Sequence, residues 1–432
     1  MAMNLTSKRG QGSFLFWQIA IFLLVISVSP SFAQQEAASK RAPWQPDPEQ
    51  AKAFEERRPG IFVHEAKVPE YELPSLLTTQ EGEAIESQEA WLIKRRPEVM
   101  RLFEHTVYGR LPGSPDRQEH ELLDRDEMAL DGKATHETIQ ITCWNGERTL
   151  TFKTELFLPN NGHERAPVFV LVNHRETEEA DPTRKTKTGF WPVEEIIARG
   201  YGTAIFREDD LSPDRRDALN EALGTLYPRP KDGKGTTWGA LAAWSWGASR
   251  VMDVLQTHAR VDHRKVAIVG HSRGGKCALW TGARDPRFTL VYSNGSGCGG
   301  AALSRRRFGE RLAQITDRFP FWFCENLQQY AEREDALPLD QHMLLALIAP
   351  RNVYIGSAAE DLWADPKGEY TSLVESGAVY RLFDDSPLSP EMPAVDEQRT
   401  TKMRGYHIRP GKHDLQANDW QYVMDFADQV WE

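Results

Sequence analysis

A serine flanked by glycines is the residue most clearly placed to do chemistry. It is the central residue of Gly270-His271-Ser272-Arg273-Gly274, between an apolar run and a segment with helical spacing. In a Gly-x-Ser-x-Gly turn from strand to helix, the serine backbone is strained and the hydroxyl is lifted out of the sheet. The first amides of the helix face the same point and can stabilise an oxyanion. Ser272 is therefore a candidate nucleophile for acyl transfer, and Arg273 is a candidate oxyanion donor.

A histidine near the C-terminus can act as the base. A serine nucleophile needs a base, and the base needs an acid that orients it. His413, in RPGKHDL, comes just before a segment whose apolar residues recur at helical spacing, so we expect it in a loop after the last strand. The alternative, His407, lies inside the strand-like segment GYHIRP and is expected to be a packed or surface histidine.

Three carboxylates after the apolar run RNVYIGSAA could serve as the acid. Asp361 stands early in the following loop, where the acid of such a triad is expected. Glu360 is expected to face away, and Asp365 could instead cap a helix. Asp361 is favoured, and the other two stay open as alternatives.

The elements that must position these residues alternate between strands and helices. Near-continuous apolar runs, typical of parallel strands covered on both faces, alternate with helical segments such as LAAWSWGASRVMDVLQT. An earlier segment, 135–159, alternates apolar and polar residues around Asn145-Gly146 and predicts an antiparallel hairpin at the N-terminal edge. The sequence predicts an α/β fold: a three-layer, doubly wound, mostly parallel sheet whose strands include 166–174, 200–208, 265–272, 288–296 and 351–361.

The chain begins with the features of an export signal. Lys8 and Arg9 precede an apolar segment, and Ser31-Phe32-Ala33 has the small residues of a cleavage site. We expect cleavage after Ala33 and export to the periplasm or the medium. Residues 34–60 are polar and weakly periodic and predict a flexible lead-in, followed by one catalytic domain over 61–432. Within it, 86–111 predicts two short helices, and 383–400 a surface loop.

Composition excludes several classes of partner. The net charge of −11 argues against nucleic acid and against stable association with an anionic membrane. The chain has no CxxC pair and no HExxH helix, so we expect no metal. The sequence leaves the oligomeric state open, with a monomer as the expectation. It also leaves open the pairing of the four cysteines, Cys143, Cys277, Cys298 and Cys324.

Several motifs together resemble one family. GHSRGGKCALW, SNGSGCGGAALSRR, DQHMLLALIAPR, AEDLWADPKGE and GKHDL are similar to motifs of glucuronoyl esterases, carbohydrate esterase family 15, particularly its bacterial branch. The resemblance runs from about Lys67 to the C-terminus. It implies an exported α/β-hydrolase without cofactor that hydrolyses the ester between 4-O-methyl-D-glucuronic acid of glucuronoxylan and lignin alcohols.

The resemblance also implies residue roles. Ser272 would be the nucleophile and His413 the base, with Arg273 contributing to the oxyanion site through backbone and side chain. Many members place the acid, a glutamate, at the position that Gly295 occupies here, so the acid must come from the later loop, which again favours Asp361. The sugar would be bound by Lys276, Glu310 and Trp363.

Two other functions are compatible with an α/β fold of this kind. An acetyl xylan esterase or general carboxylesterase would share the fold and Ser272 but would not need Lys276 or Glu310. A non-catalytic carbohydrate-binding protein should have lost a member of the triad, yet a serine, a histidine and late carboxylates are all present.

Overall fold

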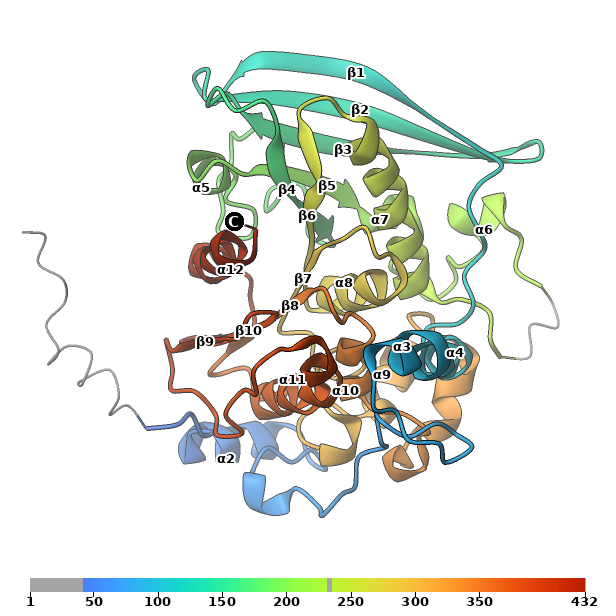
Figure 1. Cartoon of the computed structure of the whole chain (residues 1–432), viewed down its shortest axis with the longest axis vertical. Helices are drawn as coiled ribbons and strands as arrows, with labels where there is room; N and C mark the ends of the chain where they lie inside the picture. The colour runs from blue at the N-terminus through green and yellow to red at the C-terminus, as the bar shows by residue number, and fades with distance from the viewer. Residues whose placement is uncertain (1–41, 231–234, 432) are drawn as a thin grey trace, which may run out of the picture. The chain divides into compact units, whose positions relative to one another are not determined.

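One ten-stranded sheet forms the centre of the protein (Figure 1). The computed structural model describes residues 42–230 and 235–431. Strand order is β1-β2-β3-β5-β4-β6-β7-β8-β10-β9, and every pair from β5 through β10 in this order is parallel. The predicted mostly parallel sheet is confirmed. Its central strands are β4 (Ala166–Asn173), β5 (Gly202–Arg207), β6 (Val261–His271), β7 (Leu290–Asn294), β8 (Asn352–Ala358) and β10 (Arg404–Arg409).

Both faces of the sheet are covered by helices, because its central strands are apolar on both sides. In β4, Val168 and Val170 pack into one core while Phe169 and Leu171 pack into the other. Figure 1 shows α7 and α8 on one side of the sheet and α12 on the other. The longer helices are α4 (Arg96–Thr106), α7 (Ala240–Thr257), α8 (Arg273–Arg284), α11 (Pro366–Tyr380) and α12 (Ala417–Val430); the shorter ones are α3 (Gln88–Ala90), α5 (Val193–Ala198), α6 (Leu223–Leu226), α9 (Leu312–Arg318) and α10 (Gln341–Ala346).

An antiparallel extension lies at one edge of the sheet. The expected hairpin is formed by β2 (Ala134–Asn145) and β3 (Arg148–Pro159), with Gly146 at a positive φ of 59° in the connecting turn. A further strand, β1 (Arg117–Ala129), pairs with β2 and forms the outer edge. β1 was not predicted from the sequence, because nearly all of its side chains are exposed and it lacks an alternating apolar pattern.

The N-terminal part of the described chain differs from the expectation. Residues 42–60, expected to be flexible, contain helix α2 (Pro48–Arg57), and the compact unit already starts at Ala42. The Asp47 side chain caps α2 by accepting a hydrogen bond from the Gln50 amide. The buried Trp44 donates its backbone N–H to Pro393, so tertiary contacts order a segment with few apolar residues. The predicted signal peptide and residues 34–41 lie outside the described residues.

Two further segments, 86–111 and 383–400, contain the following elements. The helical region expected over 86–111 consists of α3, a π-helical turn over Trp91–Arg95 and α4, with Pro97 at the start of α4, directly after the π-helical turn. The expected surface loop over 383–400 ends in the short edge strand β9 (Gln398–Thr400). Across the described ranges, we find no helix that is both long and apolar enough to cross a membrane.

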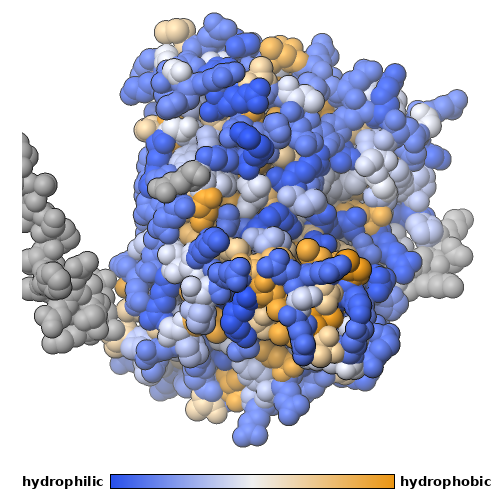
Figure 2. All heavy atoms as spheres, in the orientation of Figure 1, coloured by the Kyte–Doolittle hydropathy of each residue, from blue (hydrophilic) through white to orange (hydrophobic). Residues whose placement is uncertain are grey.

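The visible surface in Figure 2 is mainly hydrophilic, with hydrophobic side chains gathered in its lower half. All four cysteines are buried and unpaired, so the described structure contains no disulfide bond among them.

Candidate active site

Ser272 lies in a strained turn between β6 and α8. Its backbone angles are φ 53° and ψ −120°, a conformation that L residues rarely adopt. The turn is tight, because a Cβ atom at Gly270 would lie 2.0 Å from the carbonyl oxygen of Gly274. The Ser272 amide donates to the Asn294 carbonyl of β7 at 2.9 Å, which anchors the turn to the neighbouring strand. The local sequence thus produces the geometry that a nucleophilic serine requires.

His413 and Asp361 meet beside this turn. Asp361 follows β8 and His413 follows β10, and these two strands are parallel neighbours, so both loops lie at the same edge of the sheet. The Nδ1 atom of His413 lies 2.5 Å from Oδ2 of Asp361. The Asp361 side chain is buried, whereas that of His413 is 40% exposed. The pair therefore has the geometry of a base held by a buried acid.

The rival residues have other partners. Asp365 accepts a hydrogen bond from the Gly368 amide as the N-cap of α11 and also pairs with Arg306. Glu360 is exposed. His407 is fully buried and its Nε2 lies 2.8 Å from Oδ1 of Asp419. Among the weighed candidates, the structure brings together only His413 and Asp361.

Gly295 lies directly against this pair. Its φ is +52°, and a Cβ atom there would be 3.4 Å from Nδ1 of His413 and 3.6 Å from Oδ2 of Asp361. A side chain at this position would lie against His413 and Asp361. Position 295 is thus a second place from which a carboxylate could reach His413.

Two buried histidines lie behind His413. The ring centroids of His271 and His413 are 4.5 Å apart, and His174 stacks on His271 at 5.8 Å. Burial lowers the pKa of both His271 and His174 well below the usual value, and nearby positive groups lower it further. Both are therefore neutral at pH 7.

A cavity of about 130 Å³ opens over Ser272. Lys276, one helical turn after Ser272, is 4% exposed and its Nζ donates to the Ser296 carbonyl at 2.6 Å. Burial lowers the pKa of Lys276 and raises that of Glu310, and each group opposes the other's shift. The cavity is lined by Ser272, Arg273, Lys276, Gly295, Ser296, Gly297, Glu310, Arg318, Phe319, Trp322, Trp363, Ala364 and His413.

The side chain of Arg273 is held by residues that were not predicted from the sequence to belong to the site. Its Nη1 hydrogen-bonds to Asp214, whose other carboxylate oxygen accepts from Nε1 of Trp322 at 2.6 Å. The guanidinium carbon lies 4.8 Å from the Trp322 ring centroid, and Phe319 stacks on Trp322 at 3.8 Å. The aromatic cluster RFPFWF over 318–323 was the only available signal, because Asp214 comes from a distant loop without a recognisable pattern.

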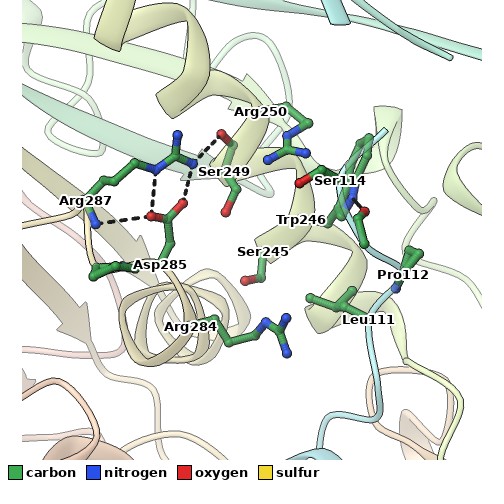
Figure 3. A pocket seen from close by; sticks show the side chains of 12 residues that line it. Leu111, Pro112, Ser114, Ser245, Trp246, Ser249, Arg250, Arg284, Asp285 and Arg287 are labelled. Carbon is green, nitrogen blue, oxygen red and sulfur yellow. Dashed lines mark hydrogen bonds and ion pairs between the residues drawn. The ribbon is translucent and has the colours of Figure 1, made fainter. Parts of the chain in front are cut away.

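A larger cavity, of about 320 Å³, lies at the far end of α8 and carries no comparable chemistry. Its arginines are neutralised by carboxylates: Arg287 pairs with Asp285, as Figure 3 shows, and Arg284 pairs with Glu104. Within the described ranges there is also no group of three or more His, Cys, Asp or Glu side chains suited to hold a metal ion.

Comparison with known proteins gives consistent matches. The family described as "Glucuronyl esterase, fungi" matches residues 141–384. The chain is 39% identical over 419 residues to "Carbohydrate esterase MZ0003" of an unknown prokaryotic organism, covering 89% of this chain and 94% of that relative. It is 25% identical over 320 residues to the 4-O-methyl-glucuronoyl methylesterase of Schizophyllum commune, covering 72% and 73%. The solved glucuronoyl esterase from Solibacter usitatus superposes with a TM-score of 0.80 at 36% identity, covering 85% of this chain and all of that one.

Proposed function

Because the chain belongs to the glucuronoyl esterases of carbohydrate esterase family 15, we propose that it cleaves the ester joining (4-O-methyl-)D-glucuronic acid of glucuronoxylan to lignin alcohols. The observation that carries this proposal is the single cavity shared by Ser272, His413, Lys276 and Glu310. The name of the fungal relative, a methylesterase of 4-O-methyl-glucuronate, supports the sugar part of the substrate.

The proposed reaction proceeds through a glucuronoyl-enzyme. Ser272 Oγ attacks the ester carbonyl carbon and passes its proton to Nε2 of His413, because Nδ1 is engaged by Asp361. The tetrahedral intermediate collapses, the ester C–O bond breaks, and the alcohol leaves with the proton from His413. Water, deprotonated by His413, then attacks the acyl carbon, the bond from that carbon to Ser272 Oγ breaks, and His413 returns the proton to Oγ as glucuronic acid is released. The two-step reaction consumes only the ester and water and requires no cofactor.

Other residues around Ser272 would stabilise the oxyanion and bind the sugar. The Arg273 amide, at the first position of α8, would stabilise the oxyanion, and its guanidinium adds positive charge nearby. Lys276, which is buried, and Glu310, which is half-buried and of opposite charge, would orient sugar hydroxyls through charge-assisted hydrogen bonds. Trp363 would offer an apolar ring face to the sugar.

Hydrolysis of benzyl glucuronate, compared with acetylated xylan and p-nitrophenyl acetate, tests this proposal. We expect benzyl glucuronate to be the preferred substrate, and Ser272→Ala to abolish its turnover while sugar binding remains. Turnover of the acetyl substrates alone would instead support an acetyl xylan esterase or general carboxylesterase, and would remove the sugar-binding roles of Lys276, Glu310 and Trp363.

Export and a monomeric state belong to the same proposal. A polymeric plant cell wall substrate requires an enzyme outside the cytoplasm. N-terminal sequencing of the processed protein should begin at Gln34, and its mass in solution should equal one chain. A mature protein that still starts at Met1 would contradict cleavage and leave an anchored form.

A further inference from the structure

The N-terminal segment, residues 42–67, contacts the part of the chain that supplies the acid and a sugar-binding aromatic residue. The indole Nε1 of Trp44 donates to the Ala359 carbonyl at 3.2 Å, two positions before Asp361. The Phe62 carbonyl accepts from the Gly309 amide at 2.8 Å. This segment therefore braces both loops next to the cavity.

The two braced loops are also packed against each other. The Glu310 amide donates to the Trp363 carbonyl at 3.0 Å. A Cβ atom at Gly309 would lie 2.5 Å from the same carbonyl oxygen, so only glycine permits this approach. The backbone of Trp363 is consequently fixed, and the orientation of its indole depends on what contacts the ring.

The ring is contacted by two side chains of the N-terminal segment. The guanidinium carbon of Arg58 lies 4.3 Å from the Trp363 ring centroid, and the Phe54 ring centroid lies 6.1 Å away at an interplanar angle of 40°. Arg58 also lies 5.2 Å from the Phe54 ring. A guanidinium over an indole face is attracted by the ring quadrupole, and tryptophan gives the strongest interaction of this kind.

We propose that Arg58 is a positioning residue for substrate binding, which acts by stacking on Trp363 and holding its indole at the wall of the cavity. The inference rests on the proposed function, since it assumes that Trp363 contacts the sugar. Arg58 is exposed and helix α2 ends one residue before it, so its side chain is not needed for the core. It contributes by restricting the ring before substrate arrives, which reduces the entropy lost on binding.

The neighbouring arginine offers a matched control. Arg57 is also exposed, but its Nε donates to the Ala53 carbonyl of its own helix. We expect Arg58→Ala to raise KM for benzyl glucuronate about two- to five-fold with kcat unchanged, and Arg57→Ala to change neither. Turnover of p-nitrophenyl acetate, which has no sugar, should be the same in both variants.

A double substitution separates positioning from a general structural effect. In a Trp363→Ala background, adding Arg58→Ala should have no further effect on KM, because its partner is already absent. Arg58→Gln, which keeps most of the side-chain length, should raise KM as Arg58→Ala does.

The inference is overturned if Arg58→Ala behaves like Arg57→Ala, if its effect persists in the Trp363→Ala background, or if it lowers turnover of both substrates alike. Failure of the unaltered enzyme to hydrolyse benzyl glucuronate would instead overturn the proposed function.

Discussion

Nδ1 of His413 lies 2.5 Å from Oδ2 of Asp361, a residue 52 positions earlier in the chain. In the proposed reaction this contact would orient the ring and stabilise the imidazolium that forms when Ser272 is deprotonated. We expect Asp361→Asn to lower kcat by roughly 10³- to 10⁴-fold with little change in KM, as measured by steady-state kinetics with benzyl glucuronate. Glu360→Gln, at the exposed neighbour, is the control and should be silent; full activity of Asp361→Asn would remove Asp361 from the triad.

The position of Gly295 beside His413 allows the acid to be placed at residue 295 instead of residue 361. Because a Cβ atom there would lie 3.4 Å from Nδ1 of His413, a glutamate side chain could approach the ring from this side. We expect Gly295→Glu to restore at least about 10-fold of the kcat lost in Asp361→Ala, despite the strain of a positive φ. Gly295→Gln in the same background is the control without charge. Equal activity of the two double variants would show that position 295 cannot supply the acid.

The contact between Asp214 and Arg273 gives a third prediction. Asp214→Asn removes the charge that holds the guanidinium and weakens the link to Trp322. We expect kcat/KM for benzyl glucuronate to fall roughly 10- to 100-fold, because a mobile arginine stabilises the oxyanion less well. Asp217→Asn, an exposed residue of the same loop, should leave kcat/KM unchanged. A kcat/KM of the Asp214 variant within two-fold of that control, about 0.4 kcal/mol, would exclude the role.

The buried Glu369 predicts how stability depends on pH. It accepts hydrogen bonds from the Gly297 amide and the Ser357 hydroxyl, but burial raises its pKa to about 7. Between pH 4.5 and 7 the unfolded chain loses this proton while the folded protein keeps it, so the free energy of unfolding falls as pH rises. The loss should approach about 3 kcal/mol above pH 7.

Urea unfolding of the unaltered protein and of Glu369→Gln between pH 5 and 8 measures this effect. The difference in unfolding free energy between the two should change as pH rises from 5 to about 7 and then level off, with the unaltered protein becoming less stable relative to Glu369→Gln. Glu375→Gln, at an exposed position of the same helix, is the control and should follow the unaltered protein. A constant difference between the unaltered protein and Glu369→Gln would mean that Glu369 titrates normally.

Sequence reasoning succeeded where function depends on local pattern. Continuous apolar runs predicted the parallel strands, and the Gly-x-Ser-x-Gly turn predicted the strained Ser272; the family resemblance and the α/β-hydrolase fold are confirmed by the comparisons. The meeting of His413 with Asp361 followed from strand order, because loops after parallel neighbours lie at one edge.

The sequence did not predict structure that depends on contacts between residues far apart in the chain. Trp44 is the only large apolar residue over 42–53, and its burial depends on segments more than 300 residues away. Asp214 likewise has no local signature, since its role exists only once the loop is packed against Arg273. Such contacts are tertiary and leave no periodicity in the sequence.

Strand β1 has a consequence for association between copies of the protein. It lies at an open edge of the sheet, where an unpaired backbone can recruit a further strand and start aggregation. Its sequence, RQEHELLDRDEMA, contains five carboxylates and only two arginines, so an identical strand pairing with it would meet net like-charge repulsion. The polar sequence because of which β1 was not predicted as a strand therefore opposes the growth of sheets between copies of the protein.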